Sequence, residues 1–225
     1  MIIVTGASRG LGRAITEHLN KNGHHVIGLV RSTHSLSFEV VECDVSNYTS
    51  VKQAARAVKK MNENVDAVIN CAGIASMNMA ITTNESTVQK MIQTNLVGTI
   101  YSCQLFAPIM LRQKYGTFIN FSTIAVPLAL KGESVYVASK AGVEAFSRCF
   151  AREMADFNVR VNCIAPGPIR TDLLNGITDS QIKKIISQQI ITKQFHKSDV
   201  CDLVELLIDN RASSLSGQIF NIGGV

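Results

Sequence analysis

Residues 2–12 read Ile-Ile-Val-Thr-Gly-Ala-Ser-Arg-Gly-Leu-Gly, and this stretch decides the fold. Its apolar, β-branched start predicts a strand over residues 2–5, and the pattern after the turn predicts a helix over residues 10–22. Glycines at 6, 10 and 12 allow a tight turn, a close approach of the backbone to a pyrophosphate, and packing of the helix on the strand. Because a helix start attracts phosphate, a glycine turn between a strand and a helix predicts dinucleotide binding rather than an ordinary loop.

The same alternation of short apolar runs and helical patterns continues along the chain. Further strands are predicted at residues 25–30, 38–42, 67–70, 117–122, 161–165 and 218–222, and further helices at 49–62, 86–93, 98–114, 136–156, 179–189 and 198–209. Several strands are apolar on both faces, as in a parallel sheet covered by helices on each side. We therefore expect an α/β protein with one Rossmann-type, doubly wound parallel sheet, formed by a single domain over residues 1–225.

The link between the second and third strands is short. It comprises residues 31–37, whereas a parallel crossover through a helix usually needs a dozen residues or more. A minimal loop or a single turn is expected there, on the side where an adenine ribose would lie.

Composition excludes several classes of protein. With 46% hydrophobic and 17% charged residues, the chain can bury a large core. The net charge of +5 comes from scattered Lys and Arg, and aromatic residues make up 6%, so a solvated basic surface is favoured over nucleic-acid binding. The six cysteines form no metal or disulfide pattern, which favours a reducing cytoplasm. No cationic leader and no run of 18 apolar residues occurs, so no membrane association is expected.

Two arginines indicate which nicotinamide cofactor binds. In dinucleotide folds, an acidic residue at the end of the second strand holds the ribose 2′-hydroxyl of NAD. Here that strand ends at Val30 and is followed by Arg31, whose guanidinium can donate two hydrogen bonds to a 2′-phosphate. Arg9 in the glycine turn can reach the same phosphate. NADP(H) is therefore the predicted cofactor; the alternative is that both arginines are merely solvated.

Several motifs, taken in order, resemble the short-chain dehydrogenase/reductase family in its single-domain form, over nearly the whole chain. Besides the glycine turn, they are Asp44-Val45, Asn70-Cys71-Ala72-Gly73 with cysteine in place of a second asparagine, Asn95, Tyr136-Val137-Ala138-Ser139-Lys140, and the segment from Pro166 to Thr171. The cofactor contacts predicted from these motifs and from the two arginines are Gly6, Ser8, Arg9, Gly10, Leu11, Gly12, Arg31, Asp44, Val45, Asn70, Ala72, Gly73, Tyr136, Lys140, Pro166, Gly167, Ile169 and Thr171.

The spacing of Tyr136 and Lys140 fits acid–base chemistry. Residues four apart on a helix share one face. A free phenol has a pKa of about 10, and a nearby ammonium favours the phenolate. Lys140 is thus expected to tune Tyr136, which would give a proton to a carbonyl oxygen as a hydride reaches the carbon, or take it back in oxidation. The resemblance also gives Lys140 a hydrogen bond to the nicotinamide ribose and gives Asn95 a water in a proton relay. The alternative for Asn95 is a helix cap before Gly98.

The hydroxyl partner of Tyr136 departs from the family pattern. The family usually has a serine thirteen positions before the tyrosine, where this chain has Thr123. Threonine keeps a hydroxyl that can donate and accept, although its methyl group narrows the pocket. The adjacent Ser122 could be presented instead by a local bulge. Thr123 is the preferred assignment.

Residues 171–198 are expected to form a lid over the substrate. This segment is rich in apolar side chains: Leu173, Leu174, Ile177, Ile185, Ile186, Ile190 and Phe195. Met77 and Met79 fit either the mouth of the site or the core. Within the family the chain resembles most the 3-oxoacyl-(acyl-carrier-protein) reductases, and Arg170 beside the lid would suit an acidic carrier protein. Another ketoreductase or alcohol dehydrogenase, and a non-catalytic sensor, remain the alternatives.

The resemblance also implies a homotetramer or homodimer formed through the helices at residues 98–114 and 136–156. Their apolar faces fit an interface and also fit core packing; they carry Leu105, Phe106, Ile109, Phe146 and Phe150. The pair His24-His25 is expected to face solvent, with no metal, because no other ligand cluster accompanies it.

Overall fold

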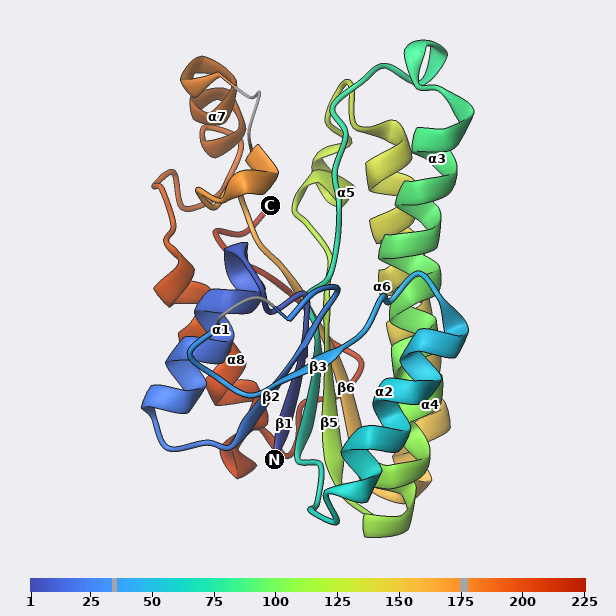
Figure 1. The fold of residues 1–225 in the computed structure, drawn as a ribbon. Helices are drawn as coiled ribbons and strands as arrows, with labels where there is room; N and C mark the ends of the chain where they lie inside the picture. Colours follow the sequence, from blue (N-terminus) through green and yellow to red (C-terminus); the bar gives the residue numbers. More distant parts are fainter. Residues whose placement is uncertain (34–35, 175–177) are drawn as a thin grey trace.

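A seven-stranded parallel sheet forms the centre of the computed structural model, which describes residues 1–33, 36–174 and 178–225 (Figure 1). The strand order is β3-β2-β1-β4-β5-β6-β7, with every neighbouring pair parallel. The strands are β1 Ile2–Thr5, β2 Val26–Val30, β3 Val40–Glu42, β4 Ala67–Asn70, β5 Gly116–Phe121, β6 Val159–Ala165 and β7 Ile219–Asn221. The predicted doubly wound α/β sheet is confirmed.

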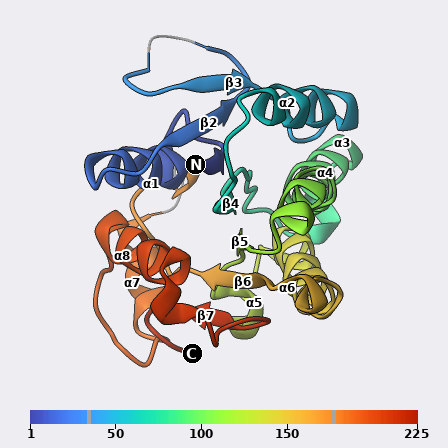
Figure 2. The same cartoon turned by 90° about the horizontal axis from the view of Figure 1, so that it is seen from below.

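Helices cover both faces of this sheet (Figure 2). One face carries α1 (Gly10–Lys21) and α8 (Lys197–Ile208), and the other carries α2 (Tyr48–Lys60), α4 (Gly98–Gln113) and α6 (Ser134–Met154). The shorter helices are α3 Glu85–Met91, α5 Ala125–Leu128, α7 Asp179–Ile186, the π-helix η2 Ile92–Val97, and the 3₁₀ turns η1 Ala80–Thr82, η3 Ala155–Phe157, η4 Asp172–Leu174 and η5 Asn210–Ala212.

Two apolar layers hold the helices on the sheet. Successive residues of a strand point to opposite faces, so Val68 and Phe118 pack into the layer under α2, α4 and α6, whereas Ile69 and Ile119 pack into the layer under α1 and α8. All four side chains are fully buried. Burial on both faces explains why these strands read as continuous apolar runs.

The apolar faces expected at an oligomer interface divide between core and surface. Phe106 and Phe150 belong to the buried layer beneath α4 and α6. Leu105, Ile109 and Phe146 are half-buried at its edge. Core packing therefore accounts for the first two residues and leaves the other three available for an interface.

The connection from α3 to α4 differs from the prediction of two separate helices. The chain continues from α3 through the π-helical turn η2 directly into α4. A π-helical turn adds one residue within an unbroken helix. The added residue shifts the hydrophobic period, so the sequence pattern predicts a break there. The helix α5 was not predicted, because a four-residue segment is too short to show a period. Most other boundaries lie within two residues of their predicted positions.

The carboxyl ends of β1 and β4 form the point where the strand order reverses, since β1 lies between β2 and β4. Crevices at such points are the usual ligand sites of open α/β sheets. The glycine turn leaves β1 here and the Asn70–Gly73 motif leaves β4. On the adenine side, residues 31–33 and 36–39 contain no helix, in agreement with the predicted minimal loop.

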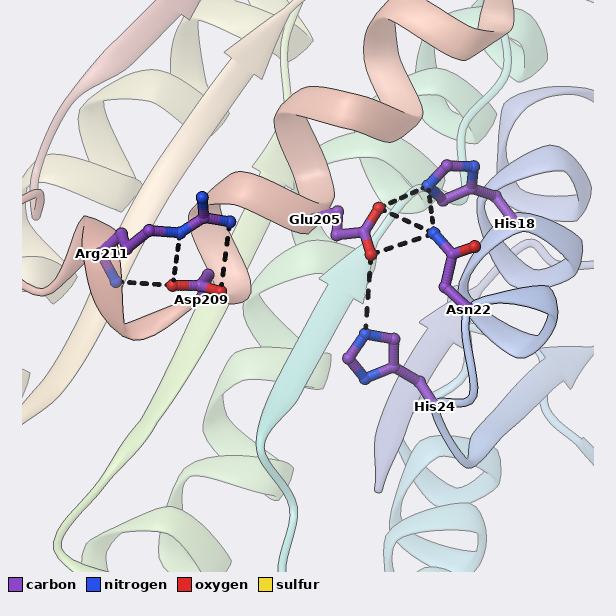
Figure 3. A network of polar contacts seen from close by, with 6 residues as sticks. All are labelled: His18, Asn22, His24, Glu205, Asp209 and Arg211. Carbon is purple, nitrogen blue, oxygen red and sulfur yellow. Dashed lines mark hydrogen bonds and ion pairs between the residues drawn. The ribbon is translucent and has the colours of Figure 1, made fainter.

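A polar network ties α1 to α8 on the molecule's surface (Figure 3). The Nε2 atom of His18 lies 2.7 Å from Oε2 of Glu205, and the amide of Asn22 donates to both carboxylate oxygens at 3.0 and 2.9 Å. His24 lies 4.0 Å from the same carboxylate, and the next residue, His25, contacts Glu39 and Glu63. Both members of the histidine pair are thus partly exposed and next to carboxylates. Within the described ranges no group of His, Cys, Asp and Glu could hold a metal ion.

Candidate active site

A cleft of about 620 Å³ lies along the carboxyl ends of the strands and joins the glycine turn to the Tyr136–Lys140 pair. All of the predicted cofactor residues line this cleft except Asn70. Thr123 also lines it, whereas Asn95 does not. The predicted residues come from seven separate stretches of sequence, and the sheet brings them to one edge.

The glycine turn is shaped for close backbone approach. Gly6 has φ +68°, which is the left-handed region, and a Cβ there would lie 2.8 Å from the Cα of Ala72. A Cβ on Gly12 would lie 2.4 Å from the carbonyl oxygen of Gly6. Arg9, the N-cap residue of α1, forms no side-chain capping bond with the described residues, so N–H groups of the first turn remain free to donate to phosphate oxygens.

The adenine side of the cleft carries two exposed arginines. Arg9 and Arg31 both line the cleft, and both are exposed. Asp44 lies nearby at the end of β3, where its Oδ1 accepts hydrogen bonds from the backbone N–H and the hydroxyl of Ser46 at 2.9 and 2.7 Å. Arg31 directly follows β2 and lines the cleft at the position where an acidic residue would select NAD.

Asn70 is predicted to contact the cofactor, but in the structure it does not line the cleft. Its Nδ2 donates to Oδ1 of Asn120 at 2.8 Å, and Asn120 in turn donates to the hydroxyl of Ser147 at 2.8 Å. All three side chains are buried. Asn70 ends β4, and its Nδ2 also donates to Sγ of Cys103 in α4 at 3.3 Å, so its amide joins β4 to β5 and α4.

Asn95 lies in the π-helix η2 and is fully buried, so it does not cap a helix. Its Oδ1 accepts from the N–H of Ile74 at 2.8 Å, and its Nδ2 donates to the carbonyl of Ile74 at 2.8 Å and to the hydroxyl of Ser139 at 3.0 Å. A Cβ on Gly73 would lie 3.4 Å from both Asn95 Oδ1 and Lys140 Nζ. Asn95 therefore fixes the loop after β4 against the helix that carries Tyr136 and Lys140.

Tyr136 and Lys140 lie on the face of α6 that lines the cleft, and both are buried. The Nζ of Lys140 donates to the carbonyl of Phe121 at 2.8 Å. Burial raises the pKa of the Tyr136 phenol, the charge of Glu133 raises it further, and a hydrogen bond with Thr123 lowers it. Burial also lowers the pKa of Lys140. The net shift of the Tyr136 pKa is upward, opposite to the lowering expected from Lys140, because burial penalises the charged form of the phenol.

The two candidate hydroxyls point in different directions. The hydroxyl of Ser122 donates to Oε1 of Glu144 at 2.6 Å in a buried contact with α6. The hydroxyl of Thr123 accepts from the N–H of Ala125 at 3.2 Å, and its side chain lines the cleft with Tyr136 and lowers the pKa of the phenol. Both residues line the cleft, but the hydroxyl of Ser122 is engaged by Glu144, whereas no side-chain acceptor holds that of Thr123 among the described residues.

Only some of the apolar residues of the expected lid line the cleft. Leu173, Leu174 and Ile185 line the cleft, together with Met77 from the loop after β4. Ile177 lies outside the described residues, and Met79 is exposed and does not line the cleft. Beyond α7, the backbone N–H of Ile191 donates to the carbonyl of Gly223 at 2.8 Å, so this end of the segment is held by the last residues of the chain.

Arg170 is engaged within the same segment. Its Nη2 lies 3.0 Å from Oδ1 of Asp179, and both side chains are more than two-thirds exposed. An exposed pair of this kind contributes about 0–1 kcal/mol. The arginine proposed for an acidic carrier protein therefore contacts the first residue of α7 in this structure.

Comparison with known proteins gives the family. The model of the short chain dehydrogenase family matches residues 1–182. This chain belongs to the short-chain dehydrogenase family. It is 32% identical to the 3-oxoacyl-(acyl-carrier-protein) reductase of Staphylococcus epidermidis, over 99% of this chain and 96% of the relative. It is also 32% identical to carbonyl reductase family member 4 of Xenopus laevis, over 81% of each chain. As a family member, it is an oxidoreductase acting on CH–OH groups with a nicotinamide cofactor.

Solved structures of the family agree with the fold. A 4-hydroxyisoleucine dehydrogenase mutant, complexed with NADH and succinate, superimposes with a TM-score of 0.91 at 27% identity and covers 99% of this chain and 97% of that one. The ligand-free aldohexose dehydrogenase of Thermoplasma acidophilum gives a TM-score of 0.89 at 28% identity, over 99% and 92% of the two chains. The glycine turn, the free first turn of α1 and the open cleft fit a dinucleotide of this kind.

Three residues of the site escaped sequence reasoning. Ser139 and Glu144 position Asn95 and Ser122, and Glu133 lines the cleft one turn before Tyr136. Helical spacing carried a signal for Glu144, which follows Lys140 by four residues on the same helix. Sequence carried no such signal for the other two, because the hydrogen bond of Ser139 with Asn95 and the burial of Glu133 depend on segments distant in the chain.

In the parts of the chain that the structure describes, no helix is long and apolar enough to cross a bilayer.

Proposed function

We propose that this short-chain dehydrogenase transfers a hydride between NADP(H) and a carbonyl or secondary alcohol carbon, with Tyr136 as its acid and base. The observation that carries the proposal is one cleft lined by the glycine turn, Tyr136, Lys140 and Thr123, with Arg9 and Arg31 exposed at its adenine side. The fold alone does not imply this chemistry, since one fold hosts many functions. The combination of acid, hydroxyl and phosphate cradle supports it.

The roles of the side chains follow from their contacts. A bound NADPH would supply the hydride for the carbonyl carbon. The Tyr136 hydroxyl would give its proton to the carbonyl oxygen, so that the product is a neutral alcohol. Thr123, which lines the cleft together with Tyr136, would donate to the same oxygen. Lys140, held by Phe121, would bind the nicotinamide ribose. Asn95 holds the loop against α6. The raised pKa of Tyr136 keeps the phenol protonated and ready to act as the acid at neutral pH.

The preferred substrate is a ketone of 3-oxoacyl type carried on acyl-carrier protein. The proposed enzyme acts in the cytoplasm as a homotetramer or homodimer. Support comes from the apolar lining by Met77, Leu173, Leu174 and Ile185 and from the 3-oxoacyl-(acyl-carrier-protein) reductases among the relatives. Half-buried Leu105, Ile109 and Phe146 offer the apolar surface for assembly. A second candidate is a hydroxylated ketone, because the cleft also contains a buried carboxylate, Glu133, and two structural relatives are named for aldohexose and 4-hydroxyisoleucine.

The direct test is NADPH oxidation with a panel of ketones that includes a 3-oxoacyl thioester, a hydroxyketone and a simple apolar ketone. Turnover of at least one class is expected. A protein that binds NADPH tightly by fluorescence yet turns over no member of the panel would be a sensor, and the proposal would fail.

The two arginines predict the choice of cofactor. Wild-type kcat/KM is expected to be higher with NADPH than with NADH. Replacing both Arg9 and Arg31 by Ala removes charge-assisted bonds to the 2′-phosphate, so kcat/KM for NADPH should fall by about 10- to 100-fold while that for NADH changes little. Arg13→Ala on the same helix, where the arginine pairs with Glu17 at the surface, serves as control. A wild-type kcat/KM for NADH that equals or exceeds that for NADPH would refute the assignment.

Removing the hydroxyl of Thr123 should affect activity, whereas removing that of Ser122 should affect stability. Thr123→Ala is expected to lower kcat by about 100-fold or more, the usual cost of losing an oxyanion donor, with Thr123→Ser restoring most of it. Ser122→Ala should instead lower the free energy of unfolding by about 1–3 kcal/mol, because it leaves the buried Glu144 carboxylate without its partner. Steady-state rates and urea unfolding measure the two effects. If Thr123→Ala kept near-full activity while a folded Ser122→Ala lost it, the assignment would be reversed.

A further inference from the structure

We infer that Glu133 is a specificity-determining residue that accepts a hydrogen bond from a donor group on the substrate, either a hydroxyl or an amide N–H near the reacting carbonyl. The inference rests on the proposed hydride transfer and names a chemical feature of its substrate. Glu133 stands three residues before Tyr136, at the start of α6, and lines the same cleft as Tyr136 and Thr123.

Glu133 is mostly buried as a residue and its carboxylate has no partner, yet the carboxylate oxygens are not among the fully enclosed side-chain atoms of the described residues. The residue is 7% exposed, and no side-chain hydrogen bond or ion pair joins it to any other described residue. Although it occupies the N-cap position of α6, its side chain makes no capping bond. Burying an unpaired charged group is costly, so such a group in a cleft has a strong preference for a donor.

The other acidic residues of the cleft do not share this state. Asp44, on the adenine side, already accepts two hydrogen bonds from Ser46. Asp172 is exposed to solvent. Among the acidic side chains lining the described part of the cleft, Glu133 is thus the one that is both buried and unpartnered.

The position of Glu133 defines what it can recognise. Glu133 precedes Tyr136 by three residues and lines the same cleft, and its charge raises the pKa of the phenol, so the carboxylate shares the cleft with the group that gives the proton. Apolar side chains also line the cleft, among them Leu130, Leu173 and Leu174. This combination fits a mainly apolar substrate with a donor close to its carbonyl and disfavours one with a carboxylate there. A pantetheine-type amide beside a 3-oxoacyl thioester and a hydroxyl on a ketone both supply that donor.

Matched substrates test the inference. One pair is a 3-oxoacyl thioester of N-acetylcysteamine and its N-methylated amide; the other is a hydroxyketone and its methyl ether. Wild-type enzyme should prefer the donor-bearing member of one pair by about 10- to 100-fold in kcat/KM, and the pair that shows the preference identifies the source of the donor. Glu133→Leu should reduce this ratio to about 1, and Glu133→Gln, which retains a neutral acceptor, should leave it intermediate.

The controls separate this inference from the proposed function. Glu153→Gln, at an exposed glutamate of the same helix, should leave every ratio unchanged, and thermal unfolding should show that each variant is folded. If neither pair is discriminated by wild-type enzyme, or if Glu133→Leu changes all substrates equally and only shifts the pH profile, Glu133 acts on Tyr136 alone and the inference is overturned. Absence of turnover with every ketone would instead refute hydride transfer itself.

Discussion

Tyr136→Phe is expected to lower kcat for carbonyl reduction by about 10²- to 10⁴-fold, the usual contribution of a positioned acid. The substitution removes the hydroxyl proton and leaves the buried ring, which lies 6% exposed on the cleft face of α6. Binding of NADPH should change little, because the glycine turn and the arginines are untouched. Single-turnover rates and fluorescence titration with NADPH measure these two quantities.

A control and a pH profile sharpen this prediction. Tyr48→Phe alters an exposed tyrosine at the start of α2 and should leave kcat unchanged. Since burial raises the pKa of Tyr136, the acid form persists at neutral pH, and kcat/KM for reduction should decline only above about pH 10, the ordinary phenol value. A Tyr136→Phe enzyme with wild-type kcat would show that another group supplies the proton.

Gly12→Ala is expected to have the second-largest effect, on both folding and cofactor binding. The added Cβ would lie 2.4 Å from the carbonyl oxygen of Gly6 and 2.8 Å from its carbonyl carbon. Both are backbone atoms, so the turn itself must move. A small-to-large change in a packed site typically costs about 1–3 kcal/mol, and movement of the turn should weaken NADPH binding by at least about 10-fold, because N–H groups at the helix start lose their alignment.

A second glycine of a helix provides the matched control. In Gly142→Ala the added Cβ would lie 2.8 Å from Cδ2 of Leu96, the end of a flexible side chain that can move away. Its effect on unfolding and on NADPH affinity should be clearly smaller. Urea unfolding with calorimetric NADPH titration compares the two variants. Equal affinities for Gly12→Ala and wild-type enzyme would mean that the turn does not hold the pyrophosphate.

Local patterns in the sequence were sufficient to predict the architecture. Apolar runs such as Ala67–Asn70 and the helical periods between them gave the strand and helix order, because burial on one or both faces leaves a direct trace in residue type. The glycine turn located the cofactor end, since its conformation demands residues without a Cβ. The i,i+4 spacing placed Tyr136 and Lys140 on one face of α6 for the same local reason.

Tertiary structure alone decided the features that depend on contacts between distant segments. Asn70 turns to Asn120 and away from the cleft, Ser122 turns to Glu144 and leaves the position beside Tyr136 to Thr123, and Glu133 becomes buried without a partner. The pKa of Tyr136 rises because burial, and after it the charge of Glu133, disfavours the phenolate. The sequence by itself determined which residues reach the carboxyl edge of the sheet; packing between strands and helices determined where their side chains point and how they are charged.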